Sequence, residues 1–148
     1  MKRISLLASF LIAATMVISH TSSATAVACT ANPGHTVDGS GGMAWGGCAN
    51  DGIVYKVDLI VCIETGTPVN PLDDPHTVWS SMGCSAVKHP YPGYTGVNSV
   101  GFACVTGQLY KERVDTYVVA HDRSGTVVGT AFAYGPSILG VRTTCHGG

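Results

Sequence analysis

Six cysteine residues constrain the fold of this chain more than any other feature of its sequence. The closest two, Cys48 and Cys62, are 14 positions apart, whereas zinc sites usually draw on near pairs such as Cys-x-x-Cys. An even number of well-separated cysteines predicts three disulfides and folding in an oxidising compartment. Spacing alone leaves many connectivities open, and we take the pairing of sequence neighbours as the working hypothesis: Cys29 with Cys48, Cys62 with Cys84, and Cys104 with Cys145.

The N-terminal segment has the pattern of a secretory signal peptide. Lys2 and Arg3 precede an apolar run of 15 residues from Ile4 to Ile18. This run is shorter than the about 20 residues that a membrane-spanning helix needs. We therefore expect a secreted, extracellular protein with no membrane span in its mature form.

Two positions satisfy the need of signal peptidase for small residues before the cut. Ala24-Thr25-Ala26 predicts cleavage after Ala26, which makes residues 1–26 the signal peptide, and Ala26-Val27-Ala28 offers a second register. Lipidation of Cys29 is a third reading. It lacks the Leu usual three positions before such a cysteine, and it would leave an odd number of thiols.

The mature segment, residues 27–148, has a length typical of one domain. Without the signal peptide it carries six basic and nine acidic residues, a net charge of about −3 with neutral histidines. Binding to nucleic acid needs a clustered basic face, which so few scattered cations do not provide. We expect no nucleic-acid partner.

Alternating apolar and polar residues predict several β-strands, and no segment has a convincing helical period. The clearest strand spans Ile53 to Glu64, with Ile53, Tyr55, Val57, Leu59, Val61 and Ile63 on one face. A hairpin is predicted from Arg113 to Tyr134, turning at Asp122-Arg123-Ser124-Gly125. Val114, Thr116, Val118 and Ala120 share one face of its first strand, and Val128, Thr130, Phe132 and Tyr134 share one face of the partner strand. Further strands are expected over 77–82, 99–105 and 138–145.

Glycine, proline and polar residues predict loops elsewhere. Residues 30–47 contain Asn32-Pro33-Gly34 and Gly39-Ser40-Gly41-Gly42 without a periodic apolar partner, so the N-terminal segment 27–47 is expected to be loop-like. Residues 65–76, with three prolines, and residues 85–97 are the other predicted loops.

Short strands, many glycines and few charges predict an all-β fold: a small immunoglobulin-like or Greek-key β-sandwich with three disulfides. The order of Cys48, Tyr55-Lys56-Val57, Trp79 and Gly83-Cys84 resembles that of small exported actinobacterial β-sandwich proteins of unassigned function. This resemblance implies a fold and no activity. True immunoglobulin domains match less well, because no Tyr stands two residues before a second Cys.

No catalytic or metal-binding signature is present, and no cofactor is expected. There is no Gly-x-Ser-x-Gly pentapeptide. The group His121, Asp122 and Ser124 has the residue types of a hydrolase triad, but a tight turn would point them apart. The pair Asp73-Asp74 is expected to be a solvated loop, with weak calcium ligation as the alternative. The mature histidines form no local metal-binding pair and are expected at the surface: His35, His76, His89, His121 and His146.

Two segments are candidates for binding. Tyr91 and Tyr94 flank Pro92-Gly93, and exposed aromatic rings beside Trp45 or Trp79 would suit recognition of an extracellular protein or glycan. Lys88 follows Cys84 and could anchor a disulfide-supported protease-inhibitor loop. The leading hypothesis is a secreted, non-enzymatic binding or envelope-associated protein. The alternatives are a protease inhibitor acting through Lys88 and a hydrolase with an unrecognised site.

Overall fold

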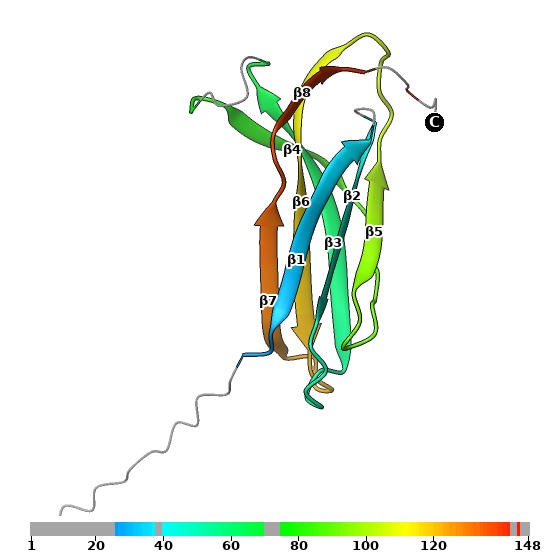
Figure 1. Cartoon of the computed structure of the whole chain (residues 1–148), viewed down its shortest axis with the longest axis vertical. Coiled ribbons are helices and arrows are strands. Elements are labelled where there is room, and N and C mark those ends of the chain that lie inside the picture. The colour runs from blue at the N-terminus through cyan, green and yellow to red at the C-terminus, as the bar shows by residue number, and fades with distance from the viewer. Residues whose placement is uncertain (1–25, 38–39, 70–74, 143–144, 146–148) are drawn as a thin grey trace, which may run out of the picture.

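The computed structural model describes residues 26–37, 40–69, 75–142 and 145, and in this part of the chain it is all-β (Figure 1). Three regions of interest lie outside the described residues: residues 1–25 of the predicted signal peptide 1–26, the pair Asp73-Asp74, and His146. The described residues contain no helix that could span a bilayer. The eight strands are β1 (Cys29–Val37), β2 (Gly41–Cys48), β3 (Lys56–Thr67), β4 (Val78–Cys84), β5 (Gly96–Gly101), β6 (Leu109–His121), β7 (Val127–Tyr134) and β8 (Ile138–Val141).

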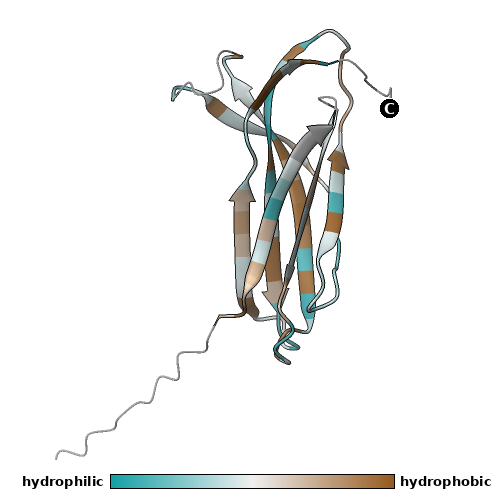
Figure 2. Cartoon of the chain, viewed as in Figure 1, coloured by the Kyte–Doolittle hydropathy of each residue, from teal (hydrophilic) through white to brown (hydrophobic). Residues whose placement is uncertain are grey.

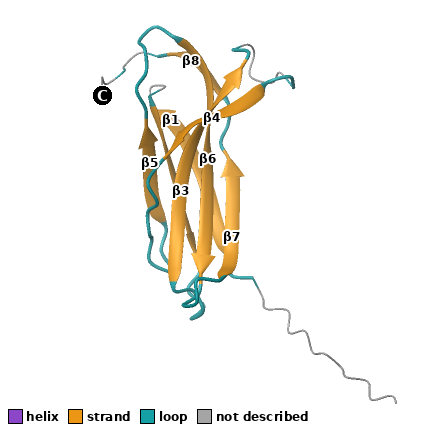
Figure 3. Cartoon of the chain, turned by 180° about the vertical axis from the view of Figure 1, so that it is seen from behind, coloured by secondary structure: helices purple, strands orange, loops and turns teal. Residues whose placement is uncertain are grey.

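Two antiparallel sheets pack against each other, which confirms the predicted β-sandwich class. One has three strands in the order β1-β2-β5, and the other has five, in the order β4-β3-β6-β7 with β8 also paired to β6. The view from behind shows β3, β6 and β7 in front of β1 and β5 (Figure 3). β8 pairs with the first residues of β6, whereas β7 pairs with its later part, so the two strands follow each other along β6.

The core forms where alternate residues of β3 and β6 point toward the three-stranded sheet. Val57, Leu59, Val61 and Ile63 of β3 are fully buried, as the alternation predicted. The four residues predicted to share one face of β6 are buried too: Val114, Thr116, Val118 and Ala120. The predicted start of the β3 strand at Ile53 is wrong, because Ile53 and Tyr55 precede it and are exposed.

The expectation of a loop over residues 27–47 is also wrong, since β1 and β2 form an antiparallel pair there. β2 has small residues where a strand usually carries large apolar ones. A Cβ on Gly46 would lie 2.5 Å from Val118 Cγ2, and one on Gly42 would lie 2.8 Å from Val114 Cγ2. Ala44, between them, is fully buried. The apolar volume comes from the opposite sheet, so β2 has no periodic apolar pattern to detect.

Smaller differences concern the ends and faces of other strands. β5 covers Gly96–Gly101 rather than 99–105, and Figure 2 shows both hydrophobic and hydrophilic bands along it. In β7, Thr130, Phe132 and Tyr134 share the outer face, but Val128 packs against the core. The register shift opposite Ala120 and His121 takes Val128 out of the alternation.

The three disulfides join Cys29 to Cys48, Cys62 to Cys84, and Cys104 to Cys145, which are the pairs expected for sequence neighbours. The first two join residues directly opposite each other, between β1 and β2 and between β3 and β4. The third closes the longest interval in sequence and links the segment after β5 to the chain beyond β8.

At the end of the sandwich near β8, a buried ion pair replaces apolar packing. Arg142 Nη2 donates a hydrogen bond of 2.6 Å to Glu112 Oε1, and both side chains are buried. The guanidinium also stacks on Phe102 and Tyr110. Burial raises the pKa of Glu112, although Arg142 opposes that rise.

Candidate binding surface

The structure separates Tyr91 and Tyr94 from Trp79. Both tyrosines are largely exposed in the segment between β4 and β5, where Gly93 N–H donates to Cys48 O. Trp79 lies on β4 in the other sheet, opposite Gly66, and Trp45 lies on β2 opposite Val97. The expected joint patch of the two tyrosines with Trp79 is therefore not formed.

Lys88 is not at the tip of a free loop. Its backbone N–H donates to Leu59 O at 3.0 Å, and its carbonyl accepts from Leu59 N–H at 2.8 Å. Asn98 Nδ2 also donates to Leu59 O and Ala86 O, at 2.9 Å each. These bonds fix the segment against the edge of β3. The backbone at Lys88 thus lacks the free groups that a substrate-like inhibitory loop offers to a protease.

The residue types of a triad at the β6–β7 turn do not form a proton relay. Ser124 Oγ bonds Asp122 Oδ1 at 2.6 Å and Thr126 Oγ1 at 2.8 Å. The bond from Ser124 lowers the pKa of Asp122. His121 instead contacts Asp58 and Gly125. These contacts are those of a polar turn, because Ser124 faces the carboxylate and not the imidazole.

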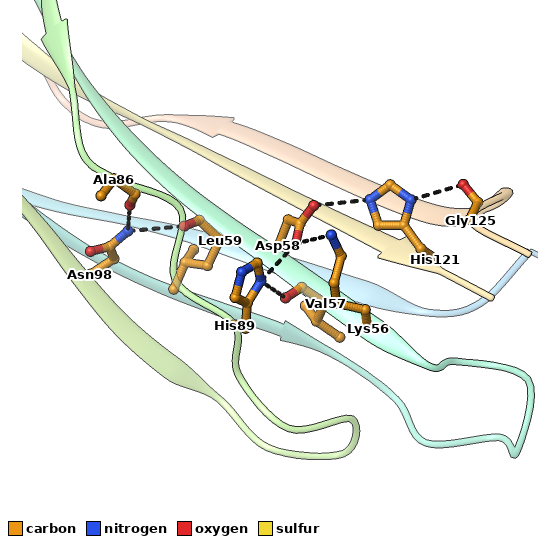
Figure 4. A network of polar contacts seen from close by, with 9 residues as sticks. All are labelled: Lys56, Val57, Asp58, Leu59, Ala86, His89, Asn98, His121 and Gly125. Atoms are coloured by element: carbon orange, nitrogen blue, oxygen red, sulfur yellow. Dashed lines mark hydrogen bonds and ion pairs between the residues drawn. The ribbon is translucent and has the colours of Figure 1, made fainter. Parts of the chain in front are cut away.

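Asp58 on β3 is the centre of a polar network that the sequence did not reveal (Figure 4). Its carboxylate lies 2.8 Å from His89 Nδ1, 3.1 Å from His121 Nε2 and 3.3 Å from Lys56 Nζ. His121 Nδ1 is also 3.3 Å from Gly125 O, so both ring nitrogens of His121 face oxygen acceptors. The network links the segment before β5, β3 and the β6–β7 turn.

Within the described ranges, no group of three His, Cys, Asp or Glu residues is arranged to hold a metal ion. His76 is exposed, as expected. An open depression next to the network is lined by Tyr55, Lys56, His121 and Asp122, among others.

A group of aromatic contacts lies on the outer face of the five-stranded sheet. Phe132 on β7 contacts Tyr117 on β6 with ring centroids 4.5 Å apart, and Tyr134 with centroids 4.4 Å apart. The exposed fractions are 39% for Tyr117, 44% for Phe132 and 53% for Tyr134. We call these three rings, together with Arg113 and Trp79, the aromatic face.

Arg113 on β6 contacts aromatic rings on two other strands, β4 and β7. Its guanidinium lies 3.9 Å from the centroid of Tyr134 and 4.5 Å from that of Trp79. It also donates from Nε to Glu64 Oε2 at 2.7 Å. A planar cation that stacks on aromatic rings and pairs with a carboxylate is held in a fixed orientation.

Asp115 lies under this face and is fully buried, between Cys62 on β3 and Tyr134 on β7. Burial raises its pKa to about 6, and the neighbouring Glu64 adds to the rise while Arg113 opposes it. Burial and the two carboxyl groups also raise the pKa of Tyr117. Because Asp115 is closed off from solvent, its carboxyl group cannot contact a ligand. Its influence on the surface is electrostatic.

Sequence reasoning found parts of this surface and missed its assembly. The shared face of Phe132 and Tyr134 was predicted, but Arg113, Asp115 and Tyr117 were not singled out. Their signal is the alternation itself: they occupy the outward positions of a strand whose inward positions are apolar. The contact of Arg113 with Trp79, 34 positions earlier, depends on the order of strands in the sheet.

Comparisons with known proteins find no matching family model, no similar curated protein and no similar solved structure.

Proposed function

We propose that this chain is an exported, non-enzymatic binding protein that recognises a partner protein through the aromatic face. The carrying observation is that Tyr117, Phe132 and Tyr134 stay partly exposed on a sheet face, where the ring of Phe132 contacts both of the other rings. Contiguous exposed apolar side chains are unfavourable in water, and such patches are typical of interaction sites.

The composition of the face favours a protein as the ligand. Tyr, Trp and Arg are the residues most enriched among those that contribute strongly to protein–protein binding. The rings lie toward the middle of the sheet, while Asp58, His89 and His121 form a polar group nearer one end. An apolar centre with a polar rim is the usual anatomy of a protein interface.

Export is the second part of the proposal. Its support is the pattern of residues 1–26 together with three disulfides, which form and persist in oxidising compartments. Two hollows beside the β6–β7 turn, both lined by Tyr55 and Asp122 among other residues, are open to solvent.

Affinity capture with the oxidised mature protein from its native culture, read by mass spectrometry, tests the proposal when it is run with two matched variants. Tyr134→Ser with Phe132→Ser removes two exposed rings of the aromatic face. Tyr91→Ser with Tyr94→Ser removes two exposed rings elsewhere. We expect the first variant to weaken binding by about 30-fold or more and the second to leave it unchanged, since a single interface anchor contributes about 2 kcal/mol or more.

Three outcomes would contradict the proposal. Equal capture by the face variant would show that the partner binds elsewhere, and loss only in the Tyr91/Tyr94 variant would assign binding to the loop. Sedimentation would reveal the third: a dimer that the face variant dissociates, which would mean that the face binds a second copy of this chain.

A further inference from the structure

We infer that signal peptidase hydrolyses the bond between Ala26 and Val27, so that Val27 is the first residue of the exported protein. The inference rests on the proposed export and assigns the site of processing, which the residue pattern leaves open between Ala26 and Ala28. The fold distinguishes these two registers because it uses the residues between them.

Val27 belongs to the core although it precedes the first strand. Its exposed fraction is 6%, and it packs in the cluster of Cys48, Val57, Leu59 and Val118, among others. Its backbone N–H donates to Val128 O at 3.0 Å. Ala26, one residue earlier, is exposed. The boundary between exposed and buried chain therefore coincides with the predicted scissile bond.

The opposite strand is shaped to receive this segment. A Cβ on Gly129 of β7 would lie 2.6 Å from Val27 O, 3.0 Å from Val27 Cβ and 3.1 Å from Cys29 Sγ. Only a residue without a side chain leaves room for the chain to pass there. Ala28 contributes as well, because its carbonyl accepts from Ala49 N–H at 2.8 Å.

Cleavage after Ala28 would remove these contacts. It would delete the buried Val27 side chain and the hydrogen bonds to Val128 and Ala49, leaving the space beside Gly129 empty. Lipidation of Cys29 would remove the same two residues. It would also place a thioether on Cys29 Sγ, and that sulfur could then not form the disulfide to Cys48.

The proposed step consumes one water molecule. Water adds across the Ala26–Val27 amide, and the products are a carboxylate on Ala26 and an amino group on Val27. The new terminal ammonium keeps hydrogens to donate to Val128 O, so the backbone contact survives cleavage.

The experiment is an intact-mass measurement of the unreduced product that a host exports from the full precursor. We expect the mass of residues 27–148 with three disulfides. The matched variants are Ala28→Val, which spoils only the second register and should still yield Val27 as the first residue, and Ala26→Val, which spoils the first and should reduce that product strongly.

A second measurement keeps the inference independent of the host. Refolded, oxidised chains that begin at Val27 and at Cys29 are compared by thermal unfolding, and the shorter chain should unfold at least about 5 °C lower. Equal midpoints, or an exported product beginning at Cys29 with or without lipid, would overturn the assignment. A precursor that is never cut and stays in the cell would overturn the proposed export as well, whereas a cut at another bond would overturn the register alone.

Discussion

At the scale of single residues, the outer surface of the sandwich is organised by charged groups in unusual surroundings. Arg113 lies between Tyr134 and Trp79 and pairs with Glu64. Asp115 is buried beside Glu64 and Arg113. Glu64 raises the pKa of Asp115, and Arg113 lowers it. This arrangement gives the molecule a testable response to pH.

Asp115 should make the folded state less stable as the pH rises from about 4 to about 6. Its pKa in the folded protein is about 6 and the ordinary value is 3.8, so between these values the folded state holds a proton that the unfolded state has lost. Stability falls with pH wherever the folded state binds more protons. We expect a loss on the order of 2 kcal/mol, less than the full shift implies, because the interacting Glu64 is partly solvated.

Urea unfolding at several pH values between 4 and 7 measures this effect, and Asp115→Asn is the matched variant. The amide keeps the shape of the side chain but does not titrate, so the variant should lose less stability over the same range. Glu112, whose pKa is also raised by burial, is present in both proteins. It accounts for the dependence of stability on pH that remains in the Asp115→Asn variant. Identical slopes in the two proteins would contradict the assignment to Asp115.

At the scale of elements, the least expected feature is that β2 packs closely against the opposite sheet because its inward-facing residues have little or no side chain. Gly42, Ala44 and Gly46 face the valines and Ile63 of the opposite sheet. Because protein interiors are densely packed, two sheets can approach closely only where a small residue on one sheet faces a larger side chain on the other. β1, β2 and β5 thereby form a layer that fits over β3 and β6.

Gly46→Ala should destabilise the protein by about 1–3 kcal/mol. The added methyl group would lie 2.5 Å from Val118 Cγ2 and 2.7 Å from Thr30 O, and neither the core nor the backbone of β1 can yield without strain. Denaturant unfolding measures the loss.

Gly101→Ala is the control for this substitution. It also adds a methyl group to a strand glycine of the same sheet, but there the nearest atom, Ser40 O, is 3.8 Å away. We expect its free energy of unfolding to stay within about 0.5 kcal/mol of that of the parent protein, or to rise slightly. Equal destabilisation by both substitutions would mean that strand propensity, and not contact between the sheets, explains the effect.

At the scale of the whole molecule, two disulfides each join neighbouring strands of one sheet. The third joins the segment after β5 to the chain beyond β8. Cys62–Cys84 holds the edge strand β4, and with it Trp79, to β3. Chain crosslinks of this kind stabilise mainly by restricting the unfolded chain.

Replacing Cys62 and Cys84 together by Ala should lower the free energy of unfolding by about 2–4 kcal/mol while the sandwich still forms. Urea unfolding gives the loss, and circular dichroism dominated by β-structure checks the fold. The parent protein, alkylated without reduction, should take up no label because all six cysteines are paired. Labelling of several thiols in the parent, or a mainly helical spectrum, would contradict the fold itself.

The sequence by itself determined the class of fold and much of its core. Alternation identified the residues that share the buried face of each strand: every second residue from Val57 to Ile63 in β3 and from Val114 to Ala120 in β6. A period of two can be detected locally because it is a property of a strand packed on one side. The cysteine count predicted three disulfides for a similar reason: it depends on chemistry and compartment, and not on arrangement.

Only the tertiary structure decided where β1 and β2 lie and which residues share the outer surface. Gly42 and Gly46 read as loop residues because the apolar volume that they pack against belongs to other strands. Trp79, Arg113 and Tyr134 meet because β4, β3, β6 and β7 are neighbours in that order. Such contacts are set by the pairing of distant strands, and no local pattern of residues encodes that pairing.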